Sequence, residues 1–185
     1  MNKIPSITKV LAKIVEVFHW VGVALMAAAT VCSVAAPQLV RYFVGLDTAG
    51  RGWADMDVYG VNITAPCVDG MVDSTVFLIF GISGVIVLGL MAMVFRNLYL
   101  ILKRSESSTP FQKDNVRMLR EMGIFCISVP VVGLVMNIVA RLVLGADAVE
   151  TSLNMAGFFL GFVMLTLSHV FARGIELEQD VDGLV

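Results

Sequence analysis

The sequence predicts an all-α membrane protein, a bundle of four transmembrane helices, and three observations lead to this fold class. Of the 185 residues, 58% are hydrophobic and 15% are charged, whereas a soluble domain is about half apolar and about a quarter charged. Four uncharged stretches each exceed the roughly 18 apolar residues that mark a transmembrane helix. The charged residues cluster between these stretches, which are residues 17–40, 74–95, 122–140 and 151–172.

Each stretch is expected to form a helix rather than a barrel strand. Runs of about 20 residues without period-two alternation indicate helices, because the strands of a membrane barrel span about 9–11 residues. The second helix continues past Arg96 to the end of a helix-forming segment at Arg104, and Ser105–Ser108 then interrupts it. We expect a single domain over residues 1–185, with helices at about residues 15–38, 74–103, 118–144 and 151–173.

The distribution of lysine and arginine predicts the topology, because these residues remain on the cytoplasmic side of membrane helices. Only three lie at the opposite side: Arg41, Arg51 and Arg141. The other ten share one side: Lys3, Lys9, Lys13, Arg96, Lys103, Arg104, Lys113, Arg117, Arg120 and Arg173. Both termini are therefore expected in the cytoplasm, with a cytoplasmic loop at about residues 104–117 and a longer outer loop at about residues 39–73.

The outer loop contains turn residues and one of two cysteines near the outer surface. Glycine and proline residues predict turns that frame a short hairpin around residues 58–64. Cys32 and Cys67 would both lie near this surface, where an oxidising exterior permits a disulfide. The sequence leaves open whether the two cysteines pair.

Small residues in the spans predict close helix packing. Helices in lipid associate through small residues that let their backbones approach. The fourth span carries Gly157-x-x-x-Gly161. We expect this motif to pack within the chain, and a seam between two copies in a homo-oligomer is the alternative.

The cytoplasmic loop predicts a basic amphipathic helix that leads into the third span. Thr109 can cap the helix, Pro110 suits its first position, and Gln112 completes a capping box. Its polar face carries Lys113, Arg117 and Arg120. This face either anchors the chain to anionic lipid of the bilayer or forms a docking surface for a cytoplasmic partner.

The segment after Arg173 is acidic, so we expect residues 174–185 to form a cytoplasmic tail opposite the basic loop. Its carboxylates are Glu176, Glu178, Asp180 and Asp182. They can pair with the basic loop, or they can bind a basic cytoplasmic protein such as a DNA-binding regulator.

Two of these segments carry a family resemblance. Residues 109–116, followed by Leu119 and Arg120, resemble the PF-x-x-(E/D)-N-x-x-x-L segment of the DUF2975 family, and residues 174–185 resemble the closing pattern of that family. The resemblance implies a small four-helix protein of the bacterial inner membrane with no assigned function and no catalytic residues. Members are often encoded beside a small helix-turn-helix regulator, which implies a cytoplasmic partner of that kind.

Polar residues within or near the spans give two further hypotheses. His19 and His169 share a depth on the first and last spans, so they are haem-ligand candidates, although two locally hydrogen-bonded histidines are the simpler interpretation. Asn137 and Arg141 lie one turn apart on the third span, and an intramembrane ionisable group is a functional hypothesis by default. A structural role is the favoured interpretation of both.

Together these features predict a non-enzymatic membrane protein, regulatory or sensory, that engages a cytoplasmic partner. The sequence contains no nucleophile–base pair, metal cluster or phosphate loop, so no enzyme, metal or cofactor is expected. Direct binding of nucleic acid is not expected either, because the basic residues lie close to the membrane. The alternatives are an oligomeric transporter or channel, and a redox protein that uses haem or quinone.

Overall fold

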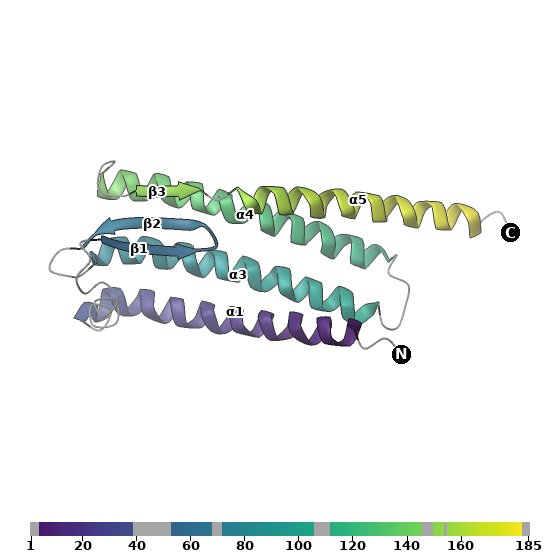
Figure 1. Cartoon of the computed structure of the whole chain (residues 1–185), viewed down its shortest axis with the longest axis horizontal. Helices are drawn as coiled ribbons and strands as arrows, with labels where there is room; N and C mark the ends of the chain where they lie inside the picture. The colour runs from purple at the N-terminus through teal and green to yellow at the C-terminus, as the bar shows by residue number, and fades with distance from the viewer. Residues whose placement is uncertain are drawn as a thin grey trace. The chain divides into compact units, whose positions relative to one another are not determined.

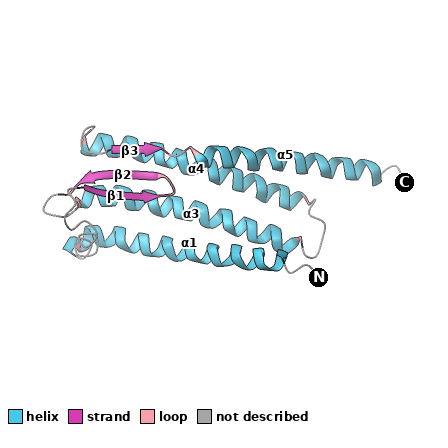
Figure 2. Ribbon diagram, viewed as in Figure 1, coloured by secondary structure: helices cyan, strands magenta, loops and turns pink. Residues whose placement is uncertain are grey.

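Within the residues that it describes, the computed structural model has four long helices and three strands (Figures 1 and 2). It describes residues 4–38, 53–67, 72–105, 112–145, 150–153 and 155–182. The four helices are long and apolar enough to cross a membrane, which confirms the predicted set of four membrane-length helices. The elements are α1 (Ile4–Ala35), β1 (Trp53–Val58), β2 (Val61–Pro66), α3 (Ser74–Arg104), α4 (Lys113–Leu144), β3 (Glu150–Leu153) and α5 (Ala156–Asp182).

Three helix boundaries can be compared with the sequence prediction. α3 continues past the uncharged stretch and ends at Arg104, as predicted. α5 begins at Ala156 rather than at residue 151, because residues 150–153 form strand β3, which pairs with β2. The predicted acidic tail is helical as far as Asp182. The predicted helix cap at Thr109 and Pro110 lies outside the described residues.

The chain divides into two compact units. The first unit consists of residues 1–19, 90–128 and 156–185, and the second consists of residues 20–89 and 129–155. α1, α3 and α4 each contribute residues to both units. The expected single domain stays a prediction.

In the second unit, the three strands form an antiparallel sheet in the order β1-β2-β3. Tyr59 and Gly60 connect β1 to β2 with φ angles of 53° and 79°, the pattern of a two-residue type I′ hairpin turn. This confirms the hairpin predicted around residues 58–64. The strands alternate between buried and exposed side chains, so Ile63 and Ala65 pack in a core with residues of α3 and α4: Val76, Ile79, Phe80 and Ala140.

In the first unit, contacts between neighbouring helices follow the order α1, α3, α4, α5. The His19 ring of α1 lies 5.1 Å from the Phe95 ring of α3, and Arg104 of α3 forms a 2.8 Å ion pair with Asp114 of α4. Met122 of α4 belongs to a buried apolar cluster together with Val94, Cys126 and, at its margin, Met164 of α5.

The helices differ in how much of their surface is buried. In α1, polar and small side chains are buried and large apolar ones are exposed, which is the opposite of a helix in a soluble protein. The apolar windows of α3 and α4 are 44% and 39% buried, whereas those of α1 and α5 are only 11% and 17% buried. The buried side chains of α1 are small or polar: Ala12, Glu16, Thr30 and Ser33. Its exposed side chains include large apolar ones: Ile7, Leu11, Phe18, Leu25 and Val34. In water the large apolar side chains would be inside, so this arrangement is the one expected of a helix surrounded by lipid.

Candidate functional site

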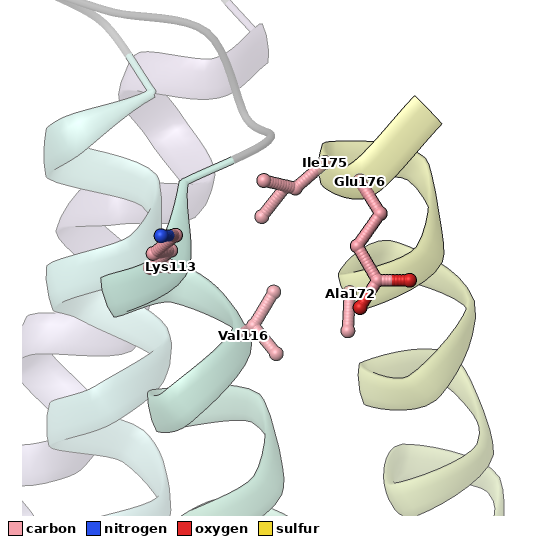
Figure 3. A pocket seen from close by; sticks show the side chains of 5 residues that line it. All are labelled: Lys113, Val116, Ala172, Ile175 and Glu176. Carbon is pink, nitrogen blue, oxygen red and sulfur yellow. The ribbon is translucent and has the colours of Figure 1, made fainter. Parts of the chain in front are cut away.

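A cavity of about 340 Å³ lies between the start of α4 and the end of α5, within the first unit (Figure 3). Lys113 and Val116 contribute from α4, and Ala172, Ile175 and Glu176 contribute from α5. Val116 and Ile175 are buried, whereas Lys113 and Glu176 are exposed. The cavity, called the α4–α5 cavity below, therefore has an apolar floor and one charge of each sign at its margin.

The position of this cavity follows from the sequence of the two helices. α4 and α5 approach each other closely at Gly123 and Gly161, where a Cβ atom on either glycine would meet the backbone of the other helix. The uncharged stretch of α5 ends at Ala172, and Arg173 follows it. The α4–α5 cavity is therefore located where the apolar part of α5 gives way to charged residues.

Lys113 and Glu176 carry the charges of the cavity. Within the part of the chain that the structure describes, neither side chain forms an ion pair. Both are partner-binding candidates from the sequence, and the structure brings them to one cavity.

The other candidates for partner binding lie around this end of the first unit. Arg117 is exposed, and its Nε lies 3.5 Å from Glu121 Oε1 one turn along α4. Glu121 also accepts a 3.1 Å hydrogen bond from Asn97 Nδ2 of α3. Arg120 is exposed. The backbone of α5 is helical at Glu178, Asp180 and Asp182, but their side chains lie outside the described ones.

The two histidines are not brought together by any described contact. His19 packs against Phe95, and its Nδ1 lies 2.7 Å from the Val15 carbonyl oxygen. His169 is exposed on α5. The contact of His19 with the Val15 carbonyl oxygen corresponds to the simpler interpretation for that residue, and for His169 this interpretation stays a prediction.

Asn137 and Arg141 occupy different environments on α4. Asn137 is buried, and its Oδ1 accepts no hydrogen bond from the described residues. Arg141 is exposed in the last turn of α4. Of these two residues, Asn137 is therefore the one that is buried in a membrane-length helix, where polar groups often mark functional positions.

Sequence reasoning missed the buried carboxylate of Glu16. This residue is 5% exposed, and its Oε2 lies 2.9 Å from Lys13 Nζ. The same ammonium group lies 5.1 Å from the centre of the Tyr99 ring on α3. The i,i+3 spacing of Lys13 and Glu16 is visible in the sequence, but nothing in the local sequence indicates that Glu16 is buried.

The exposed face of the sheet carries Asp55 and Asp57. Thr64 Oγ1 donates a 3.0 Å hydrogen bond to Asp55 Oδ1 across the hairpin. Partial burial raises the pKa of the nearby Tyr59 phenol above its ordinary value.

Cys32 and Cys67 are both free thiols. Among the residues described here, no group of three or more His, Cys, Asp or Glu side chains is arranged to hold a metal ion.

The chain was also compared with known proteins. No protein-family model, curated protein or solved structure matches it.

Proposed function

We propose that this chain is a non-enzymatic, multi-pass protein of the bacterial inner membrane that has a regulatory or sensory role and engages a cytoplasmic partner. The observation that carries the proposal is the meeting of two charged segments in the first unit. The basic start of α4 and the acidic end of α5 both border the α4–α5 cavity. Exposed charges of both signs are the features that steer and select a protein partner.

The predicted topology supports a cytoplasmic location for this surface. The side of the membrane that carries ten of the thirteen basic residues also carries the start of α4 and the end of α5. We further propose that the chain belongs to the DUF2975 family and that its partner is a small helix-turn-helix regulator. A regulator of this kind is basic because it binds DNA, so the carboxylates at the end of α5 would attract it.

Crosslinking in cells tests this proposal. A photoreactive residue replacing Arg120 should capture a specific basic protein, whereas one replacing Asp57 on the sheet should not. Binding of the captured protein is then measured with purified full-length chain and with a chain that ends at Leu177. This truncation keeps Ile175 and Glu176 in place and removes Glu178, Asp180 and Asp182.

We expect the truncation to weaken binding at low salt by about tenfold, because it removes several exposed charges of the docking surface. Asp55→Asn/Asp57→Asn is the matched control, since it removes carboxylates from β1 and should leave binding unchanged. Equal binding by full-length and truncated chains would contradict the proposal.

Transport by an oligomer is the second candidate function, and Asn137 is the observation that favours it. A buried amide oxygen without a hydrogen-bond donor inside a membrane-length helix is available to a polar solute. Solute flux into liposomes that is lost with Asn137→Leu and retained with Arg141→Gln would support this function. The absence of any flux would leave the regulatory proposal as the better one.

A further inference from the structure

We propose that the α4–α5 cavity binds the headgroup of an aminophospholipid, a lipid that carries a phosphate and a primary ammonium group. Lys113 would hold the phosphate, and Glu176 would hold the ammonium group. The site shares Lys113 and Glu176 with the proposed docking surface, but its occupant differs, because the lipid would approach from the membrane.

The charges of the cavity match a zwitterion. A lysine ammonium group binds phosphate as a point charge, and a carboxylate accepts charge-assisted hydrogen bonds from a primary ammonium group. Lys113 and Glu176 come from different helices and form no ion pair within the described chain. A ligand with both charges would satisfy both side chains at once, whereas a purely anionic ligand would leave Glu176 facing a like charge.

The volume and the apolar floor agree with a lipid headgroup. About 340 Å³ falls at the lower end of the range of small-molecule sites. Val116, Ala172 and Ile175 offer apolar surface to the glycerol backbone and the first carbons of the acyl chains. A small soluble zwitterion would leave this surface without a partner.

The position along α5 distinguishes a lipid from a soluble ligand. The uncharged stretch of α5 ends at Ala172, and Arg173 is the first charged residue after it. Basic and acidic side chains at such a boundary lie at the level of the lipid headgroups. The occupant is therefore a membrane lipid. The carboxylate of Glu176 selects a primary ammonium group over the choline headgroup, which has no N–H donor.

The test measures which lipids stay bound to the purified full-length chain. Protein is reconstituted in phosphatidylcholine nanodiscs that contain either phosphatidylethanolamine or phosphatidylglycerol, and retained lipid is counted by native mass spectrometry. We expect one retained phosphatidylethanolamine per chain, and a decrease of about tenfold in its retention with Lys113→Gln, because a charge-assisted contact is lost. Glu176→Gln should abolish the preference for phosphatidylethanolamine over phosphatidylglycerol. Lys103→Gln, at the exposed end of α3, is the matched control and should change nothing.

Four results would overturn the proposal. Equal retention of the three lipids by the unmodified chain, or retention unchanged in both Lys113→Gln and Glu176→Gln, removes the headgroup site. Competition by soluble glycerophosphoethanolamine at the affinity of the whole lipid would assign the cavity to a soluble ligand. A crosslink between two chains through Glu176→Cys would assign it to a second copy of the chain. Unfolding curves of each variant in the same nanodiscs verify that altered retention does not come from loss of folding.

Discussion

Glu16 carries the only buried carboxylate among the described residues. Its charge is compensated by the ammonium group of Lys13. The side chain of Glu16 is almost completely buried, whereas about half of the Lys13 side chain is exposed. Lys13 can therefore reach the carboxylate with its ammonium group while part of its stem remains at the surface. A buried charge is tolerated only when it is paired and hydrogen-bonded. The folded protein therefore needs Lys13 as the partner of the buried Glu16 carboxylate.

Lys13→Met is therefore expected to destabilise the protein by about 1–3 kcal/mol, because it leaves the Glu16 carboxylate buried without its partner. Glu16→Gln in the same chain should restore most of this loss, since a neutral amide is less costly to bury. The free energy of unfolding, measured by titration with a denaturing detergent in mixed micelles, gives all four corners of the double-mutant cycle. Lys103→Met controls for the loss of an exposed lysine, and a double variant no more stable than Lys13→Met would contradict this account.

Tyr59 is a second residue whose role depends on context that the sequence does not supply. A type I′ turn requires positive φ at both central positions, and asparagine or glycine usually occupies them. Gly60 satisfies this preference and was part of the sequence argument for a hairpin. Tyr59 does not satisfy this preference, although its φ angle is 53°. The turn propensities of the residues therefore locate the turn only approximately.

At the scale of elements, the contact of α4 with α5 depends on two glycines. A Cβ atom on Gly161 would lie 2.7 Å from the Gly123 carbonyl oxygen and 2.5 Å from Ile127 Cγ1. The first of these atoms belongs to the backbone and cannot move without shifting α4. The motif Gly157-x-x-x-Gly161 thus supplies, through Gly161, a contact within the chain, as the sequence predicted. The partner Gly123 was not predictable, because the pairing of helix faces is not encoded by one span alone.

Gly161→Ala is expected to destabilise the helix pair by about 1–3 kcal/mol through overpacking against the α4 backbone. Gly89→Ala is the matched control in α3, because nothing lies within 4 Å of a Cβ atom built there. It should be neutral or should stabilise the protein by up to about 1 kcal/mol, through the better helix propensity of alanine. Detergent-induced unfolding compares the two variants, and equal stability of both would show that the close approach of α4 and α5 is not needed.

Strand β3 is an element that hydropathy did not predict. Long apolar runs are strong signals, so four membrane-length helices and the end of α3 at Arg104 followed from the sequence. Residues 151–153 are also uncharged, and they were therefore assigned to the last span. Their pairing with β2 depends on residues far away in the chain, and such a long-range partner leaves no local signal. The α4–α5 cavity was missed for the same reason, although Lys113 and Glu176 were both predicted as binding residues.

At the scale of the whole molecule, the distribution of side chains identifies lipid as the expected surroundings. Large apolar side chains remain exposed on α1 and α5, including Phe18 at 70% and Phe159 at 74% exposure. Soluble monomers rarely expose apolar patches of this extent. The polar face of α1 is instead turned inward, where Thr30 and Ser33 donate hydrogen bonds to carbonyl groups of their own helix. Their hydroxyl groups are thereby satisfied without water.

The orientation of the helices in the membrane decides whether a cytoplasmic partner can reach the proposed docking surface. The excess of basic residues at the start of α1, the end of α3 and the start of α4 predicts that these ends face the cytoplasm. The hairpin of β1 and β2, which follows α1 and precedes α3 in the chain, should then face the exterior. Single cysteines at Asp57 on β1 and at Lys103 on α3 report the two sides, in a chain in which Cys32 and Cys67 are replaced by serine. Cys126 can be kept, because it is 3% exposed and should not react.

A membrane-impermeant maleimide applied to intact cells should label Asp57→Cys and leave Lys103→Cys unlabelled. Both should react once the membrane is permeabilised, because both side chains are exposed in the structure. The parent chain without either substitution controls for reaction at Cys126. Labelling of Lys103→Cys in intact cells, with Asp57→Cys protected, would invert the topology. The basic start of α4 would then face away from any cytoplasmic regulator, and the partner proposal would fail even if every helix were correctly assigned.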